Sequence, residues 1–486
     1  MANNKQHGSV VYENVDKDYF EKRKLRKFAR VFHLWALGVG AVISGDFFGW
    51  NFGLASGGFG GLFIATVIIT LMYAGLCFSI AEMTAALPHT GGAYSFARSS
   101  MGPWGGYITG LAENMDYILT PAVIVVGIGG YLGAIFGTPD SWAPFWWLVA
   151  YALFIGLNIL GVEISFRFSV AITILALLIL VVFYIGALSH VDLRANALNI
   201  PAAEGGTTWL PFGWKGVLAA LPFAIWFYLA IEQLPLAAEE SHSPQKDMPK
   251  GILLGLLTLV ACAFLTLFLN AGIAPGALEL STSDEPLFDG FKTIFGAGMG
   301  ARALALIAVA GLVASFHTII YAYGRQIYSL SRAGYFPRFL STTHGSRQTP
   351  HVALIAGGGL GFIVALVIHF SGSESPVGAA LLNMAVFGAV IAYMLQMLSF
   401  ILLRLQFPHI ERPYRSPLGM SGAVFALLIS ALTLVALFVI DPVYRKVVVG
   451  AAIWFALGLI YFAAYGRKRL VMAPEEAFAI KAMDKS

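Results

Sequence analysis

The sequence predicts an all-α integral membrane protein with twelve transmembrane helices, and three observations support this prediction. Of the 486 residues, 58% are hydrophobic and only 12% are charged, whereas about a quarter of the residues in a soluble domain are charged. The apolar stretches reach about 20 residues, the length that a helix needs to cross a bilayer. Lysine and arginine are also distributed unequally between the two sides that these stretches define. The composition therefore excludes a soluble enzyme.

Twelve apolar stretches give the predicted order of the helices. They begin near Phe32, Gly58, Trp104, Trp142, Phe166, Gly216, Gly251, Gly300, His351, Val377, Leu418 and Val443. Because twelve is an even number, both termini lie on one side, and that side holds 24 of the 30 Lys and Arg residues. The positive-inside rule therefore predicts cytoplasmic termini. Residues 1–30 are polar and contain no signal-peptide core, so we expect the first span to direct insertion.

Six carboxylates interrupt the apolar stretches, and each is a candidate functional residue. They are Asp46 in span 1, Glu82 in span 2, Glu113 and Asp116 in span 3, and Glu232 and Glu239 in or after span 6. A charged side chain at this depth costs from about 2.5 to more than 10 kcal/mol. No lysine or arginine lies at the depth of Asp46, Asp116 or Glu232, so we expect a cationic ligand or a proton to supply the counter-charge.

Span 1 is predicted to be a broken helix. Glycine and polar residues interrupt its apolar run in GVGAVISGDFFGWN, where Asp46 is the acid, and glycine weakens a helix interior. In secondary transporters, such breaks place free backbone groups around the substrate at the middle of the bilayer. The alternative is a simple kink in which Asp46 accepts hydrogen bonds from neighbouring amides.

Span 6 is predicted to contain a second break. Pro222 and Pro235 each remove a backbone donor, and Glu232 lies between them. Trp226 and Tyr228 precede Glu232, and an aromatic face beside an ammonium group contributes about 0.5–2 kcal/mol. We therefore expect these two rings at a cation site, with ordinary packing or lipid contact as the alternative.

Two further spans carry candidate residues. Asp116 lies near the middle of span 3 in GLAENMDYILTP, and with Asp46 it is expected to hold one ammonium group. Glu113 lies one turn earlier, where it either takes part in proton coupling or pairs with a donor near the surface. His317 of span 8 either titrates near neutral pH or has a structural role.

Catalytic, metal-binding and cofactor motifs are absent from the sequence, so neither an enzyme nor a cofactor is expected. Cys77 and Cys262 lie singly in apolar stretches, which gives neither metal-ligand spacing nor a disulfide framework. A net charge of +4 is too small to indicate nucleic-acid binding. A receptor or channel would show a sensory domain or a repeated pore filter, and the short loops leave room for neither.

The chain resembles the amino acid–polyamine–organocation superfamily of permeases over residues 31–465. The resemblance rests on the glycine-rich span 1, SIAEMTAALPHTGGAYSFA, NILGVEISFRF, AAEESHSPQKDMPKGI, GRQIYSLSRAGYFPRFL and LRLQFPHIERPYRSPLG, in this order. It implies a LeuT-type fold, in which spans 1–5 and 6–10 form an inverted 5+5 repeat with helices 1 and 6 unwound around the ligand. The implied parts are a cytoplasmic basic tail (1–30), a transport core of spans 1–10 (31–406), two extra C-terminal helices (407–466) and a cytoplasmic tail (467–486).

Within the superfamily, VISGDFFGWNFGLASGGFGG and PHTGGAYSFARSSMGPWGGYITGLAEN are similar to the ethanolamine permease group. Many relatives have Gly-Ser-Gly in the span 1 break, whose amides hold a substrate carboxylate, whereas the matching residues here are Ser44, Gly45 and Asp46. Two negative charges about 4 Å apart repel by about 4 kcal/mol at an effective dielectric constant near 20. The site is therefore expected to reject α-amino acids and to accept an amine without an acid group.

The resemblance also implies roles for single residues. Trp226 matches an aromatic residue that covers the ligand, Asp116 and Ser315 match ligand-facing positions, and Glu232 matches an acid that could take a proton. Two positions depart from the family pattern. Ala176 stands where proton-coupled relatives carry a lysine, and Ala230 stands where span 6 usually has a glycine.

Together these observations predict a bacterial cytoplasmic-membrane permease that takes up ethanolamine by alternating access. The predicted substrate-binding residues are Ser44, Gly45, Asp46, Asp116, Tyr117, Trp226, Tyr228 and Ser315, and the candidates for proton coupling or gating are Glu232, His317 and Glu113. Ser44, Ser315 or Tyr117 would bond the substrate hydroxyl. A permease for choline, a polyamine, or a cationic or neutral amino acid is the alternative, and uniport, proton symport and exchange all stay open.

Overall fold

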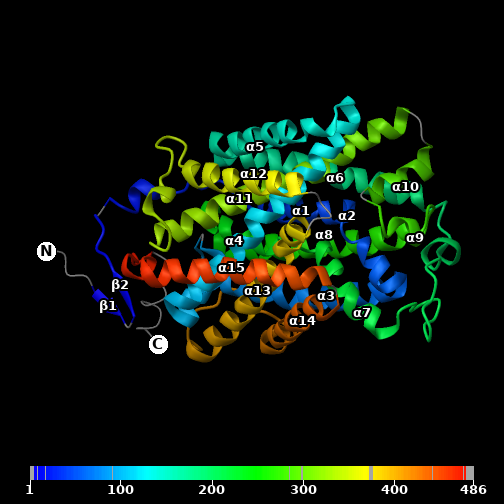
Figure 1. The fold of residues 1–486 in the computed structure, drawn as a ribbon. Coiled ribbons are helices and arrows are strands. Elements are labelled where there is room, and N and C mark those ends of the chain that lie inside the picture. Colours follow the sequence, from blue (N-terminus) through cyan, green and yellow to red (C-terminus); the bar gives the residue numbers. More distant parts are fainter. Residues whose placement is uncertain are drawn as a thin grey trace.

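The computed structural model describes residues 5–7, 9–16, 18–89, 91–283, 285–296, 299–371, 376–440, 442–473 and 476–477. Residues 1–4 and 478–486 of the two predicted tails lie outside this described part. Within it, the chain forms a bundle of long, roughly parallel helices (Figure 1). This arrangement confirms the predicted all-α fold.

The helices follow the predicted order of spans. They are α1 (Val31–Val42), α2 (Ser44–Phe47), α3 (Phe52–Ala86), α4 (Gly92–Phe136), α5 (Ala143–Leu160), α6 (Val162–Ala187), α7 (Gly213–Ala224), α8 (Pro244–Ala271), α9 (Ala277–Leu280), α10 (Pro286–Phe295), α11 (Met299–Arg332), α12 (His351–Ser371), α13 (Pro376–Gln406), α14 (Gly419–Ile440) and α15 (Pro442–Ala464). In the described part of the chain, ten helical segments are long and apolar enough to cross a membrane, and a shorter apolar one covers Val31–Phe47. The 34-residue helix α11 is the remaining expected span. The chain is thus a multi-pass membrane protein.

The outer faces of the bundle are apolar. Leu178 and Ile185 of α6, Leu257 of α8 and Leu457 of α15 are all more than half exposed. Apolar surface of this extent would promote aggregation in water, but it is favourable against lipid chains. The exposed side chains therefore mark the faces that contact the bilayer.

Two glycines divide long helices where the sequence predicts a new span. Gly58 bends α3 with φ of 66°, and Gly102 bends α4 with φ of 72°. Both angles lie in the left-handed region, which glycine reaches without the clash that a Cβ atom causes. A Cβ at Gly58 would also lie 2.2 Å from Pro211. The predicted starts of span 2 near Gly58 and of span 3 near Trp104 thus match these bends.

Both predicted helix breaks are present. In span 1, α1 ends at Val42, α2 has only four residues, and residues 48–51 form turns in which Gly49 has φ of 96°. In span 6, α7 gives way to a 3-10 turn (Ile225–Phe227), then to Ala230 with φ of 82°, and then to a 3-10 segment (Ile231–Glu240). Span 6 is therefore unwound although alanine replaces the usual glycine.

The broken spans lie inside the bundle. The helix α1 packs against α6, α8 and α11, and the 3-10 segment Ile231–Glu240 packs against α1, α3, α4, α8 and α11. The last two helices, α14 and α15, pack on α3, α4 and α13. These contacts agree with a core of ten spans and two additional helices.

The hairpin near the N-terminus and the segment after α15 lie side by side at one end of the bundle (Figure 1). The sequence predicts only a basic tail for residues 1–30, but β1 (Lys5–His7) and β2 (Val10–Tyr12) form an antiparallel hairpin. Tyr12 forms a parallel bridge with Leu470, and the Tyr12 hydroxyl donates to Glu476 Oε1 at 2.5 Å. The N-terminal and C-terminal segments therefore hold each other, which sequence periodicity does not reveal.

A second backbone link joins the start of span 1 to the end of span 6. Ala29 forms a parallel bridge with Ser241. The amide of Ala29 donates to the Glu240 carbonyl at 2.8 Å, and the amide of His242 donates to the Ala29 carbonyl at 3.0 Å. These bonds fix the two broken spans to each other at the end that carries the termini.

Candidate functional site

Ser315 of α11 joins the two sides of the span 1 break. Its hydroxyl donates to the carbonyl of Gly40 at 2.9 Å and accepts from the amide of Ser44 at 3.1 Å. Backbone groups freed by a helix break need such partners when they are buried. Since its single hydrogen is used, Ser315 can offer a ligand only an acceptor.

Asp46 is fully buried in the short helix α2. Its Oδ1 accepts from the Thr266 hydroxyl of α8 at 2.9 Å, and its Oδ2 has no hydrogen-bond partner in the part of the chain that the structure describes. The simple kink with an amide-bonded Asp46 is therefore not what is observed. A buried carboxylate oxygen without a partner is costly, so Oδ2 is suited to an external donor or cation.

The surroundings of Asp46 include polar groups that the sequence analysis did not single out. Thr266 also shares a hydrogen bond of 2.8 Å with the Tyr184 hydroxyl of α6. Asn270 lies four residues after Thr266 on α8, hence on the same helix face, and both atoms of its amide lack a described partner. The signal in the sequence is a polar pair at this spacing within an otherwise apolar helix.

Asp116 and Glu232 form a second acidic group. Asp116 of α4 is buried and accepts from the Thr120 hydroxyl at 2.7 Å. The carboxyl of Glu232 is buried, lies against Tyr393 and interacts electrostatically with Asp116. Neither oxygen of Glu232 makes a well-formed hydrogen bond to a described residue. The structure thus groups Asp116 with Glu232 and places Asp46 against α8, so a shared clamp of Asp46 and Asp116 stays a prediction.

Tyrosines surround this second group. The hydroxyls of Tyr73 and Tyr393 are 2.9 Å apart, and both side chains interact electrostatically with Glu232. Tyr117 follows Asp116 directly, and its buried hydroxyl has no partner among the described residues. Phenol rings and hydroxyls beside two carboxylates are suited to a proton or an organic cation.

The two broken spans touch at Gly45. A Cβ atom on Gly45 would lie 1.8 Å from the Trp226 carbonyl oxygen, and one on Gly49 would lie 2.9 Å from the Trp226 ring. The partly buried Trp226 ring also lies 5.8 Å from the ring of Phe48, measured between centroids. Trp226 therefore lies against the span 1 break, and its role in closing a site stays a prediction.

The neighbours of Trp226 are fully packed. The ring of Phe227 stacks on Trp50 with centroids 5.6 Å apart. The hydroxyl of Tyr228 shares a hydrogen bond of 2.6 Å with Thr70, and its ring lies 5.0 Å from Tyr73. Tyr228 also interacts electrostatically with Asp46, so the Tyr228 and Tyr73 rings lie between the two acidic groups.

Two predicted coupling residues have protein partners. Glu113 accepts a hydrogen bond of 2.6 Å from the Gln326 side chain of α11. The ring of His317 is fully buried and lies within hydrogen-bonding distance of Asn158 and Ser165, at 3.3 and 3.2 Å. The contacts of His317 join α11 to α5 and α6, and the donor to Glu113 is a buried glutamine. Roles of either residue in proton coupling or gating stay predictions.

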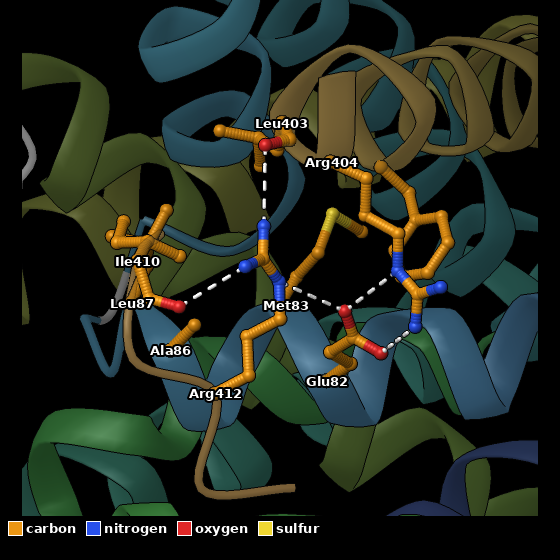
Figure 2. A pocket seen from close by; sticks show the side chains of 9 residues that line it. Glu82, Met83, Ala86, Leu87, Leu403, Arg404, Ile410 and Arg412 are labelled. Atoms are coloured by element: carbon orange, nitrogen blue, oxygen red, sulfur yellow. Dashed lines mark hydrogen bonds and ion pairs between the residues drawn. The ribbon is translucent and has the colours of Figure 1, made fainter. Parts of the chain in front are cut away.

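The other buried acids have arginine partners. Glu82 binds Arg404 and Arg412, as Figure 2 shows. Glu240 pairs with Arg325 at 2.9 Å, and both side chains are completely buried. These arginines contribute to the predicted charge bias, but only the fold brings them to their carboxylates.

A third arginine pair lies at the same end of the molecule. Glu239 pairs with Arg332 at 2.5 Å, and Tyr321 donates to Glu240. Together with the Glu240 pair, these contacts connect span 8 to the end of span 6.

Metal ligation has no support in the described residues, which contain no group of three or more His, Cys, Asp or Glu side chains suited to an ion. Cys77 and Cys262 are both buried and free. The buried polar atoms without a described partner include Asp46 Oδ2, both oxygens of Glu232, the Asn270 amide and the Tyr117 hydroxyl.

Comparisons with known proteins agree with this architecture. Residues 30–465 match a family described as amino acid permease. An uncharacterized transporter of Rhizobium meliloti is 29% identical over 416 residues, which cover 84% of this chain and 85% of its own. The branched-chain amino acid permease BcaP of Bacillus subtilis is 25% identical over 472 residues, which cover 92% and 94%. A crystal structure of MhsT in complex with L-phenylalanine matches with a TM-score of 0.61 and 16% identity, covering 87% of this chain and 100% of that one, which supports the LeuT-type fold.

Proposed function

The chain belongs to the amino acid permease family, whose members are transporters and not enzymes, and from that premise we propose that it takes up ethanolamine by alternating access. One observation carries the proposal: the span 1 break presents a buried carboxylate, with Asp46 Oδ2 unpartnered among the described residues. A break that offered only amides would suit a carboxylate ligand. Here a ligand carboxylate would meet Asp46 and be repelled, whereas an ammonium group would be attracted.

In this proposal, the substrate ammonium binds Asp46. Thr266 holds the Oδ1 atom in place, so the free oxygen is oriented before the substrate arrives. Trp226 covers the site and adds a cation–π contact, which is worth about 0.5–2 kcal/mol. Ser315 accepts from the substrate hydroxyl, with Ser44 and Tyr117 as the other candidate partners.

We further propose that Glu232 takes up a proton and couples it to closure of the site. The support is its burial beside Asp116 without a basic partner in the described chain, because two adjacent carboxylates ionise together only at high cost. A cationic substrate does not require this coupling, since the membrane potential contributes about 2.3 kcal/mol per charge per 100 mV. Proton movement during uptake would identify symport, and dependence of uptake on internal substrate would separate exchange from uniport.

The proposed setting is a bacterial cytoplasmic membrane, with both termini in the cytoplasm. Support comes from the distribution of lysine and arginine. The proposed parts are a transport core at 31–406 and two additional helices at 407–466, flanked by tails at 1–30 and 467–486.

A second candidate is a permease for amino acids, which the similarity to BcaP over nearly the whole chain favours. Uptake of choline or a polyamine is a further variant of the amine proposal. Choline cannot donate hydrogen bonds from its ammonium group, so it would depend on aromatic contacts. The two candidates differ in one respect that can be measured, namely whether a ligand carboxylate is tolerated near Asp46.

The test is uptake of ethanolamine into proteoliposomes at a fixed membrane potential, in competition with choline, putrescine, arginine and alanine. We expect small primary amines to inhibit uptake and both amino acids to leave it unchanged. Competition by alanine or arginine would show that Asp46 does not face the ligand, and it would favour the amino acid permease.

A further inference from the structure

A cage of arginines lies where α3 ends and the loop between α13 and α14 begins (Figure 2). Arg404 Nε and Nη2 donate to the two oxygens of Glu82 at 2.9 and 2.5 Å. Arg412 Nε lies 3.1 Å from Glu82 Oε1, and the Ser416 amide donates to Glu82 Oε2 at 2.7 Å. The buried carboxylate therefore holds both guanidinium groups in fixed positions.

The cage has more positive charge than Glu82 can neutralise. Arg412 uses its remaining donors on backbone carbonyls of Leu403, Phe407, Pro408 and Ile410. The Nη1 atom of Arg404 is not used in its bonds to Glu82. The exposed Arg415 has no partner in the described part of the chain. Burial, together with the charges of Arg404 and Arg415, lowers the pKa of Arg412. Arg404 and Arg415 thus have free donors, and both lie beside the guanidinium group of Arg412.

A hollow of about 210 Å³ opens beside the cage. Its lining consists of Arg404, Pro408, Arg412 and Arg415. The lining of this hollow contains no carboxylate. Glu82 lines a second hollow, which shares Arg404 and Arg412 with this one. Planar guanidinium groups around such a space match the oxygens of a phosphate group.

The surface beside the hollow is apolar. Leu405 is 66% exposed next to Arg404, and Leu418 is 40% exposed at the start of α14. Span 10 ends at this loop, and by alternation of the spans it ends on the side that carries the termini. A ligand that fits this place has an anionic head for the arginines and acyl chains for the apolar surface.

We propose that this hollow binds the phosphate group of an anionic phospholipid. Arg415 and Arg404 Nη1 contact the phosphate, and the acyl chains lie against Leu405 and Leu418. The bound lipid connects α3, α13 and α14, because Glu82 and the arginines belong to these elements or to the loop between them. The proposal depends on the membrane fold and is independent of which substrate the protein carries.

The test uses purified full-length protein in detergent, with thermal unfolding followed during titration with phosphatidylglycerol or phosphatidylcholine. We expect phosphatidylglycerol, and not phosphatidylcholine, to raise the melting temperature. Arg415→Gln should raise the half-saturating phosphatidylglycerol concentration about tenfold, since it removes a charge-assisted contact, and Arg415→Lys should restore part of the loss. Because Arg415 is exposed, these variants are expected to fold.

Arg194→Gln is the matched control, since Arg194 is also exposed but follows span 5 at the opposite end of the bundle. It should behave as wild type. Equal lipid dependence in the Arg415 and Arg194 variants, or no preference for phosphatidylglycerol over phosphatidylcholine, would overturn the proposal. Stabilisation by millimolar inorganic phosphate to the same extent would also overturn it, because the site would then bind a free anion and not a lipid.

Discussion

Replacement of Asp46 by asparagine tests the proposed ammonium site most directly. The two side chains have nearly the same shape, and an asparagine oxygen can still accept from Thr266, whose hydroxyl lies 2.9 Å from Asp46 Oδ1. The second oxygen, which has no described protein partner, becomes an NH₂ group. Asp46→Asn therefore places a donor against the donors of the ammonium and removes the attracting charge.

The size of the effect follows from the interaction that is lost. A hydrogen bond to a charged group contributes about 1.5–3 kcal/mol, and every 1.4 kcal/mol is about a tenfold change in affinity. We therefore expect the affinity for ethanolamine to fall by about 10-fold to 150-fold. Burial at the helix break places the result toward the upper part of that range, because the charge interaction there is screened less than in water.

The assay is the concentration dependence of ethanolamine uptake into proteoliposomes at fixed membrane potential, normalised to folded protein. Thr266→Val is the matched control. It removes one hydrogen bond to Asp46 and leaves the charge of the carboxylate. We therefore expect the affinity for ethanolamine to fall about fivefold, which corresponds to about 1 kcal/mol. Asp46→Asn with an apparent affinity close to wild type would refute the assignment of the ammonium to Asp46.

Three further substitutions test the breaks and the buried charges. Gly45→Ala should abolish transport and lower the folded yield, because its Cβ would lie 1.8 Å from the Trp226 carbonyl oxygen; Gly156→Ala, which meets nothing within 4 Å, is the control and should keep both. Ala230→Gly should stabilise the folded protein by about 0.5–1 kcal/mol. An alanine in the left-handed region costs about 1–2 kcal/mol, which glycine avoids, but glycine also increases the conformational entropy of the unfolded chain and so cancels part of this gain. A lower melting temperature would contradict this prediction. Glu240→Gln should destabilise the protein by about 3–5 kcal/mol, because its arginine partner is then buried without a counter-charge, and an unchanged thermal unfolding curve would show that the pair contributes nothing.

The membrane fold could be predicted because its signals are local. Span length and composition depend on neighbouring residues only, and bends at Gly58 and Gly102 coincide with glycines that begin new apolar runs. The two broken spans also follow from proline, glycine and acidic residues within one segment. At Ala230 the prediction succeeded without the usual glycine, because the surrounding packing holds an alanine at φ of 82°.

The partners of the candidate residues could not be predicted in the same way. Asp46 meets Thr266 from 220 positions away, and Glu82 meets Arg404 from 322 positions away. Nothing in the local pattern distinguishes an acid that has an arginine partner from one that has none. Asp46 lies in a glycine-rich break and Glu82 in the apolar run of span 2, but only the fold shows which of the two carboxylates has arginine partners.

The backbone link between Ala29 and Ser241 has a mechanical consequence. Since the start of span 1 and the end of span 6 are joined by main-chain hydrogen bonds, neither can swing away from the bundle alone without breaking them. Any opening toward the side of the termini would therefore move both segments together, as one unit. Spin labels placed on Arg30 and His242 should then keep a constant separation through the transport cycle, while their distances to α11 change.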